Sequence, residues 1–380
     1  MKKFLFALTI FLSAAGCSSS YVTYYSQNPA VKNTNSTSMS VSIPKTCLPG
    51  FIKVPADPLY HTPDFCVMKY DAKAADISNP TIGLQPKLGD PCDGKSGGHS
   101  YDTYKNNGPG CAVIAQNGKQ IVSTASGFPI AYVPETGSGS NNAKSYCDHM
   151  GWHLITNAEW MTIARNAEQV SANWCNPNGA GCGAAPGTPG KILANGHNNA
   201  MPDSALIASS DDSQACYGTA TDGSNTCGSA NSQKRTMTLN NGEVIWDLAG
   251  NVWQWVDGTV IRKYEPQSKS NGKLDVGWLS SEFAPGSGAL RSVIKDNGQG
   301  LTLGYDSFRP SNPGWNSTNG VGRIFHYSSA SDTNTTVYAF IRGGQWNHGA
   351  VDGAFSMHLT PVPNKTNIND VGFRCAAPLQ

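Results

Sequence analysis

The chain has 380 residues, enough for one large domain or two ordinary ones. Lys and Arg number 27 against 26 Asp and Glu, which leaves a net charge of +1 and none of the basic excess of a nucleic-acid-binding protein. Charged residues make up only 14%, whereas Gly occurs 41 times and Pro 23 times. This composition predicts a loop-rich fold with few long helices and no nucleic-acid partner.

The N-terminus has the features of an export signal. Two lysines precede an apolar run, Phe4 to Leu12, which is too short to span a bilayer. The following Ala14 to Cys17 resembles a bacterial lipobox, so residues 1–16 are predicted to be a lipoprotein signal peptide, with lipidation at Cys17. Ser18, by resemblance to Gram-negative lipoproteins, favours the outer membrane. The alternative is an ordinary secretory signal cleaved near Ala15.

Three regions follow the signal. Residues 17–46 are rich in Ser, Thr and Asn and are predicted to form a flexible tether. A single domain is predicted over residues 47–380, and the alternation in Asp64–Ala74 predicts an early strand. Residues from about 173 to 235 are rich in Gly, Asn, Ser and Asp, which indicates a long insertion within that domain.

Two helices are predicted between residues 141 and 170. The first runs from Ala143 to Met150 and is stopped by Gly151. Thr156 and Glu159 form a capping box that begins the second helix. The spacing of the apolar residues predicts that this second helix buries one face, formed by Trp160, Ile163 and Ala164.

The chain contains 11 cysteines. If Cys17 is lipidated, ten remain, and an exported chain could form up to five disulfides from them. The pairs Cys175/Cys182 and Cys216/Cys227 each lie close together in a polar loop and are predicted to be bonded. The alternative is a mixture of pairs and free thiols. No CxxC motif or zinc-like Cys/His spacing occurs in the sequence.

The most specific motif is WDLAGNVWQWVDG, Trp246 to Gly258. Its tryptophans surround a turn at Gly250-Asn251, which predicts a tight hairpin that packs a core. The pattern resembles the formylglycine-generating-enzyme/sulfatase-modifying-factor family, whose fold is C-type-lectin-like. Three further stretches resemble that family in the same order: Tyr146–Arg165, Arg342–Trp346 and Val371–Ala376.

The resemblance extends roughly from Phe65 to Cys375, with the insertions unmatched. It implies an α+β domain of the C-type-lectin-like, formylglycine-generating-enzyme type, loop-rich and stapled by disulfides. It also implies a disulfide between Cys147, in the first helix, and Cys375, in the last strand. On the loop-entropy account, such a bond stabilises the fold by roughly 4–5 kcal/mol.

The chemistry of the family is not matched. Its oxidases bind copper through a cysteine pair shortly after R-G-G-S, but the sequence from Gln345 to Arg374 contains no Cys. The motifs of a calcium-dependent lectin are altered as well, with EPQ at Glu265–Gln267 and WNH at Trp346–His348. We therefore predict no enzyme activity and no cofactor, while a structural calcium ion stays open. The alternative is an enzyme of this family, or an inactive relative with a structural role in the cell envelope.

Residues 342–375 resemble the variable region of diversity-generating-retroelement target proteins, which share the C-type-lectin-like fold. The matching motifs are RGGQWNHG, GAF and INDVGFRC. In that family, mutagenesis directed at adenines rewrites Asn codons into many residue types, although Gln, Met and Lys are never reached. Gln345, Met357 and Lys365 are therefore predicted to be framework, and Gly353 to Phe355 a buried pivot.

The candidate variable positions are those reachable from an Asn codon, and they are expected on exposed loop and strand surface. They are Asn347, His348, Val351, Asp352, Ser356, His358, Thr360, Asn364, Thr366, Asn367, Asn369 and Asp370. A relative that is no longer diversified would have much the same sequence.

The sequence thus predicts a ligand-binding lipoprotein at the cell surface, anchored by lipid in the outer membrane. Its variable region would bind a protein or glycan on another cell, a phage or a host. The identity of that ligand and the oligomeric state stay open.

Overall fold

The computed structural model describes residues 45–83, 119–137, 142–177, 181–219, 233–267, 269–270, 273–274, 276–284, 304–328, 333–365 and 368–380. The chain divides into two units, Met1–Pro44 and Lys45–Gln380, and every described residue belongs to the second. The predicted signal peptide, Cys17 and nearly all of the predicted tether therefore lie outside the described residues. None of the described helices has the length and apolar character needed to cross a membrane.

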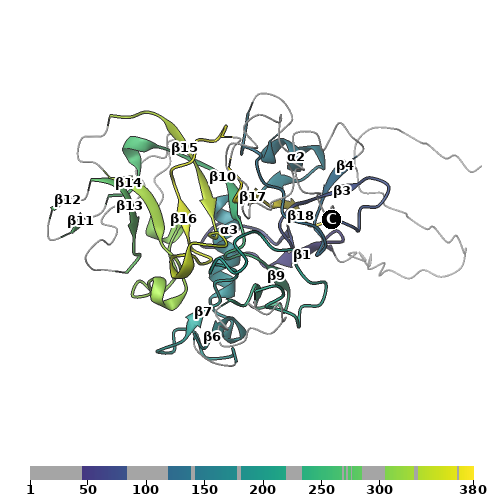
Figure 1. Ribbon diagram of the computed structural model, residues 1–380, viewed down its shortest axis with the longest axis horizontal. Coiled ribbons are helices and arrows are strands. Elements are labelled where there is room, and N and C mark those ends of the chain that lie inside the picture. The colour runs from purple at the N-terminus through teal and green to yellow at the C-terminus, as the bar shows by residue number, and fades with distance from the viewer. Residues whose placement is uncertain are drawn as a thin grey trace, which may run out of the picture. The chain divides into compact units, whose positions relative to one another are not determined.

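The second unit is rich in short strands and has few helices, as the α+β prediction expected in its general form (Figure 1). In the described residues, a four-stranded sheet has the order β1-β2-β18-β5, and a six-stranded sheet has the order β13-β14-β16-β15-β10-β17. The strands of the first are β1 (Phe51–Val54), β2 (Phe65–Met68), β5 (His153–Leu154) and β18 (Cys375–Pro378). The strands of the second are β10 (Trp253–Ile261), β13 (Gly277–Ser281), β14 (Ile324–Ser328), β15 (Val337–Arg342), β16 (Met357–His358) and β17 (Val371–Phe373).

Further strands form two-stranded sheets in this part of the chain: β3-β4, β6-β7, β8-β9 and β11-β12. Their bounds are β3 (Lys73–Asp76), β4 (Lys119–Val122), β6 (Trp174–Cys175), β7 (Ile192–Leu193), β8 (Thr236–Thr238), β9 (Val244–Trp246), β11 (Lys269–Ser270) and β12 (Lys273–Leu274). The predicted early strand over Asp64–Ala74 is therefore two elements, since β2 ends at Met68 and β3 begins at Lys73.

Both predicted helices are confirmed. Helix α2 (Ala143–His149) ends before Gly151, whose φ of 76° suits glycine. Helix α3 (Asn157–Ala167) has Thr156 at its N-cap, and the predicted capping box with Glu159 is present. Its predicted buried face is also confirmed, because Trp160, Ile163 and Ala164 are fully buried.

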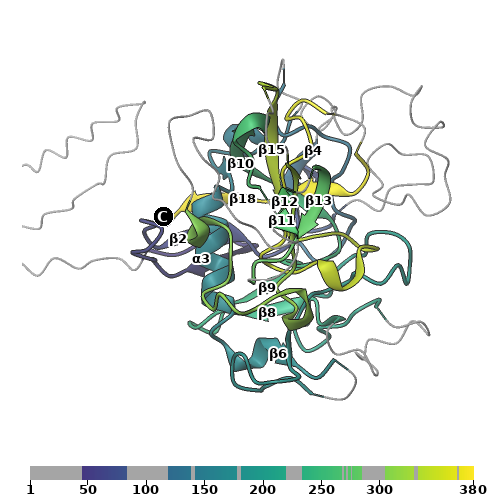
Figure 2. The same cartoon turned by 90° about the vertical axis from the view of Figure 1, so that its left-hand side faces the viewer.

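The six-stranded sheet separates two hydrophobic clusters. On one face, α3 packs against a cluster that includes Val256, Phe340 and Met357, and Trp160 Nε1 donates a hydrogen bond of 2.8 Å to the Ala354 carbonyl. On the other face, residues of α2 pack with those of β10, β15 and β17 in a second cluster. Figures 1 and 2 show α3 beside the sheet, and Figure 1 shows β13 and β14 at the end farthest from β18.

The prediction of a hairpin at Trp246–Gly258 is wrong. Strand β9 pairs with β8, whereas β10 pairs antiparallel with β15 and parallel with β17. Between β9 and β10 the chain makes a compact turn, with positive φ at Asp247, Gly250 and Asn251. The side chain of Gln254 donates to the Asp247 carbonyl at 2.7 Å, so the turn is closed by contacts of its own.

Two buried ion pairs fix this turn to the rest of the chain. Arg235 donates to Asp247 from Nε and Nη2, each at 2.7 Å, and Arg374 Nη2 lies 2.9 Å from Asp71 Oδ1. Asn251 donates to both carboxylates, at 3.2 Å to Asp71 and 3.4 Å to Asp247. All five side chains are nearly or fully buried, and buried charges are tolerated only when they are paired and hydrogen-bonded in this way.

Disulfides connect distant and local parts of the fold. The implied bond between Cys147 and Cys375 and the predicted bond between Cys175 and Cys182 are both present. A third joins Cys47 to Cys66, a pairing that the sequence left open. Cys216 is disulfide-bonded too, but its predicted partner Cys227 lies outside the described residues.

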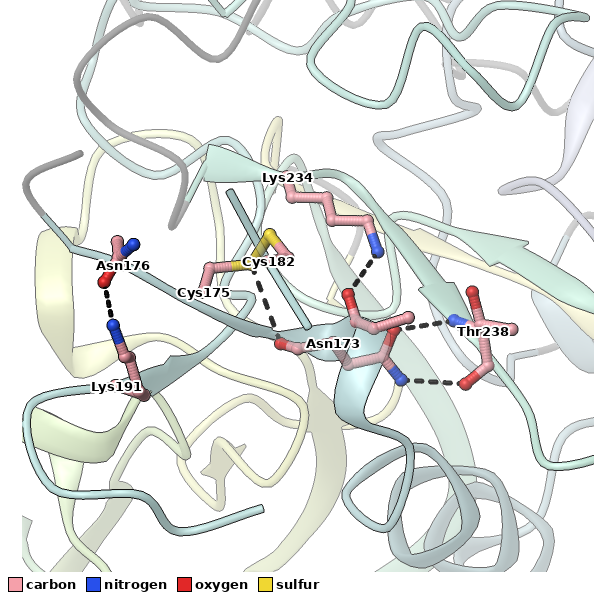
Figure 3. The surroundings of a disulfide bond; sticks show 8 residues. Asn173, Cys175, Asn176, Cys182, Lys191, Lys234 and Thr238 are labelled. Carbon is pink, nitrogen blue, oxygen red and sulfur yellow. Dashed lines mark hydrogen bonds between the residues drawn. A yellow bond between two sulfur atoms is a disulfide. The ribbon is translucent and has the colours of Figure 1, made fainter. Parts of the chain in front are cut away.

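The N-terminal part of the predicted insertion belongs to the core. Asn173 and Trp174 are fully buried, and Asn173 exchanges two hydrogen bonds of 2.8 Å with the backbone of Thr238 (Figure 3). The Cys175–Cys182 disulfide lies directly beside these contacts, and Cys175 Sγ is 3.9 Å from the Asn173 carbonyl. The bond therefore closes a short loop against a buried polar anchor.

The long disulfide should stabilise the fold much more than the short one. Cys147 and Cys375 are 228 residues apart, so replacing both with Ser should lower the free energy of unfolding by about 5 kcal/mol on the loop-entropy account. Replacing Cys175 and Cys182, only 7 residues apart, should cost about 2 kcal/mol. Urea unfolding of the two double variants checks this, and equal losses would contradict it.

Candidate binding surface

The candidate variable region begins where β15 ends, at a fully buried arginine. Arg342 is the last residue of β15. Its guanidinium donates to the carbonyls of Phe355 and Ser307, each at 3.2 Å, and to Asn157 Oδ1. Burial lowers the pKa of Arg342. These contacts hold the start of the region to α3 and to the GAF segment.

Two glycines follow, and both are required by their surroundings. Gly343 and Gly344 have φ values of 93° and 92°, a conformation that side chains rarely adopt. A Cβ on Gly344 would lie 2.1 Å from Cγ of Asp352, and one on Gly343 would lie 2.9 Å from the Leu248 carbonyl. The chain therefore passes through a space that admits backbone only.

Asp352 and Ser356 are not on the surface, which corrects the expectation of exposure. Both are fully buried. Asp352 Oδ2 accepts a hydrogen bond of 2.9 Å from the Gln345 backbone N–H, and Ser356 Oγ donates to the Val351 carbonyl at 3.1 Å. They satisfy main-chain groups inside the loop, which explains why polar side chains occur there. The predicted pivot is confirmed, since Gly353, Ala354 and Phe355 are buried.

Part of the predicted insertion lies against the start of the candidate variable region. Trp346, which is buried, donates from Nε1 to Asp203 Oδ1 at 3.0 Å, and Asn347 Nδ2 lies 3.3 Å from the same oxygen. The Gly349 N–H donates to the Asn198 carbonyl at 2.7 Å. Residues from the insertion therefore border the candidate surface.

Eight of the twelve candidate positions are at least partly accessible. Asn347 and Asn364 are exposed, and the half-buried positions are His348, Val351, His358, Thr360, Asn369 and Asp370. Thr366 and Asn367 lie outside the described residues. Of the three predicted framework residues, Gln345 and Met357 are buried, whereas Lys365 is exposed.

Two histidines of the region rest on two aromatic rings of the sheet. The His358 ring is stacked on Phe325 with centroids 5.1 Å apart, and it meets Trp253 edge-on at 5.5 Å. The His348 ring lies 5.7 Å from Trp253 and 5.6 Å from Phe325. Sequence reasoning missed Phe325 as part of this surface, because IFHYS does not alternate between apolar and polar residues, and the alternation of buried and half-buried side chains appears only in the structure.

The titratable groups of this cluster influence one another. Burial raises the pKa of Asp352 to about 6, although the hydrogen bond and charge of His348 oppose the shift. For His348, burial opposes the charged form, but attraction to Asp352, 3.4 Å away, and to Asp370 outweighs it and raises the pKa. Burial, with repulsion from His348, lowers the pKa of His358 to about 3. Burial also raises the pKa of Asp370.

The arrangement offers hydrogen-bonding and aromatic groups on a rigid base, which suits recognition. Among the described residues, no three His, Cys, Asp or Glu side chains are placed so that they could hold a metal ion. No protein-family model matches the chain, and no curated protein matches it.

Gly344→Ala should destabilise the protein more than Gly349→Ala. Both glycines have positive φ, at 92° and 69°, but only Gly349 has open space around the added Cβ. Gly349→Ala should therefore show the conformational cost alone, about 1–2 kcal/mol. Gly344→Ala should lose about 1–3 kcal/mol more, because the methyl group meets Asp352. Urea unfolding midpoints measure both, and equal midpoints would show that the Asp352 contact is easily relieved.

Asp352→Asn should change how stability depends on pH. Because the folded-state pKa of Asp352 is raised from 3.8 to about 6, the folded state binds its proton more tightly than the unfolded state. The contribution of Asp352 to stability therefore falls as pH rises through this window, by about 3 kcal/mol in all. Relative to wild type, the Asn variant should become more stable as pH rises.

Asp64→Asn provides a control with the opposite sign. The exposed Asp64 carboxyl has its pKa lowered by its hydrogen bond with Lys53, so its stabilising effect is lost as pH falls. Denaturant titrations of both variants across this pH range make the comparison. A flat difference between wild type and Asp352→Asn would contradict the buried, proton-binding role of Asp352.

Proposed function

We propose that this protein is a lipid-anchored surface receptor whose domain is C-type-lectin-like and of the formylglycine-generating-enzyme type. Its ligand contacts the accessible side chains of residues 347–370, and a retroelement diversifies those positions. The ligand is a protein or glycan on another cell, a phage or a host. The anchor is Cys17 in the outer membrane.

The fold assignment is supported by the sequence motifs and by one covalent feature. The disulfide between Cys147 of α2 and Cys375 of β18 has the placement that the resemblance implies. The helix pair and the strands around RGGQW and VGFRC also follow the expected order along the chain.

The observation that carries the proposal is the separation of accessible from buried residues within one short segment. Eight candidate positions are accessible, whereas the residues that hold the segment in place, among them Arg342, Trp346 and Asp352, are buried and hydrogen-bonded. Accessible side chains can therefore change with little effect on the buried contacts, which is the property that a diversified surface needs. A surface that is ordered before binding also loses less entropy on binding.

The position of the chain ends is compatible with display. The backbones of Thr46 and Gln380 exchange hydrogen bonds of 3.0 Å and 3.2 Å, so the described chain begins beside its C-terminus. In Figure 1 this end lies on the right, whereas β14 and β16 lie on the left. Thr46 and Gln380 therefore lie away from β14 and β16 within the second unit.

An enzyme of the parent family is the main alternative. The sequence lacks the cysteine pair that such enzymes place after R-G-G-S. Copper-dependent oxidation of a thiol-containing peptide by the purified protein would favour the enzyme and contradict the receptor.

Natural variation in this gene should follow the accessibility of the side chains. Sequencing the 3′ end of the gene and its downstream region in many isolates should reveal a near-copy repeat beside a reverse transcriptase, with adenine-rich Asn codons at the variable positions. Substitutions should gather at accessible positions such as Asn347, His358 and Asn364 and should be absent at the buried Asp352 and Ser356.

Two results would contradict the proposal. An invariant tail without a repeat would indicate a fixed binding or structural lipoprotein. Substitutions spread equally over buried and accessible positions would show that the variation is not shaped by display on this surface.

A further inference from the structure

One face of the six-stranded sheet is buried at one end and accessible to solvent at the other. Residues that pair across strands place their side chains on the same face, and the register links Trp255 to Ile341, Ile341 to His358 and His358 to Phe325. Trp255 and Ile341 are buried in the core, while His358 and Phe325 are half-buried. Accessibility thus increases from β10 towards β14.

The open end of this face carries an exposed cluster of apolar and aromatic residues. Tyr327 lies two residues beyond Phe325 and pairs with Trp278 of the neighbouring strand β13, with ring centroids 5.1 Å apart. The guanidinium of Arg262 lies 3.5 Å from the Tyr327 ring and 4.7 Å from the Trp278 ring. We call these three residues, with Val276, which lies two residues before Trp278, the aromatic patch.

The aromatic patch exposes large apolar side chains to water, which is energetically unfavourable. Trp278 is 54% exposed and Val276 is 68% exposed. Large apolar side chains gathered at one place on a surface commonly mark an interaction site, whereas single exposed ones need no explanation. The stacked guanidinium and the Tyr338 hydroxyl, which accepts a 3.2 Å hydrogen bond from Arg262, hold the patch in one arrangement.

We propose that the aromatic patch is a constant docking element that binds the same protein partner as the variable segment. The inference rests on the function proposed above. The two parts are continuous, because His358 of the variable segment stacks on Phe325, which is followed on the same strand face by Tyr327. None of the patch residues lies in the variable region, so diversification leaves them unchanged.

A protein fits the aromatic patch better than a polysaccharide. The planes of Trp278 and Tyr327 are inclined at 74°, so the two rings do not form the flat ledge on which successive sugar rings stack. The exposed Val276 contributes apolar area, which stabilises protein interfaces through burial. Trp, Tyr and Arg are also the residues that most often dominate the binding energy of protein interfaces.

The charges around the aromatic patch indicate an acidic partner surface. Arg262 belongs to the patch, and the next residue, Lys263, is exposed. The nearby carboxylate of Glu265 accepts a 2.6 Å hydrogen bond from the Tyr327 backbone N–H. The partner should therefore present an apolar side chain bordered by Asp or Glu.

The experiment selects peptides from a phage-displayed random library on the immobilised full chain and then measures their binding to variants. Trp278→Ser removes the centre of the patch, and Asn347→Ala together with Asn364→Ala tests the variable segment. Leu59→Ser is the matched control, because Leu59 is an equally exposed apolar residue, 55% accessible, outside the patch. The unfolding midpoint of each variant verifies that it is folded.

Selected peptides should be enriched in apolar residues flanked by Asp or Glu. Their affinity should fall about tenfold or more with Trp278→Ser and also with the Asn variants, but not with Leu59→Ser. Unchanged binding to Trp278→Ser, with loss in the Asn variants, would overturn the docking element and leave the proposed function standing.

Loss with Trp278→Ser alone would make the aromatic patch a separate site and overturn the joint surface, and with it the proposed role of the variable segment. A parallel test on a panel of immobilised glycans separates the classes of partner. Glycan binding by the wild type that Trp278→Ser abolishes would overturn the assignment to a protein.

Discussion

The buried guanidinium of Arg374 is the contact on which the rest of the fold depends. Arg374 lies between β17 and β18, which are the last strands along the chain in the six-stranded and the four-stranded sheet. Its guanidinium donates to the Met68 carbonyl at 3.0 Å, to Asp71 at 2.9 Å and to the Trp246 carbonyl at 3.0 Å. These acceptors come from the beginning and the middle of the described chain. Because a fully buried cation must have its hydrogen bonds satisfied, the three segments can be arranged in few other ways. The end of the candidate variable region is thereby fixed to the core.

The start of that region is fixed in a similar way but with neutral acceptors. Arg342 donates to carbonyl and amide oxygens, and Asp352 then closes the loop by accepting the Gln345 N–H. Between the two arginines, the buried side chains satisfy main-chain groups, and the accessible ones make few contacts of this kind. The segment therefore combines a rigid backbone with replaceable side chains, which is the physical basis of the proposed display function.

The accessible surface also depends on the core below it. Trp253 belongs to the same cluster as Trp255 and Ile341, and it supports the rings of both His348 and His358. Core packing fixes Trp253 and Phe325 below the histidines, while His348 also contacts Asp352 and His358 accepts a hydrogen bond from the Thr360 backbone N–H. The aromatic patch continues this face to β13, so one sheet supplies part of the core, the base of the candidate variable segment and the proposed docking element.

The sequence alone determined the features that depend on near neighbours. The capping box of α3, the end of α2 at Gly151 and the short disulfide between Cys175 and Cys182 each involve residues that are close along the chain. The long disulfide followed from family resemblance instead of from spacing. Tertiary structure decided the remainder because it depends on pairing between distant segments.

Strand β10 pairs with β15 and β17 in place of the expected hairpin partner, and the buried position of Asp352 depends on how the loop closes over Gly344. The grouping of Arg262, Trp278 and Tyr327 likewise requires β13 and β14 to pair beside the end of β10, and the local sequence of each element contains no sign of it.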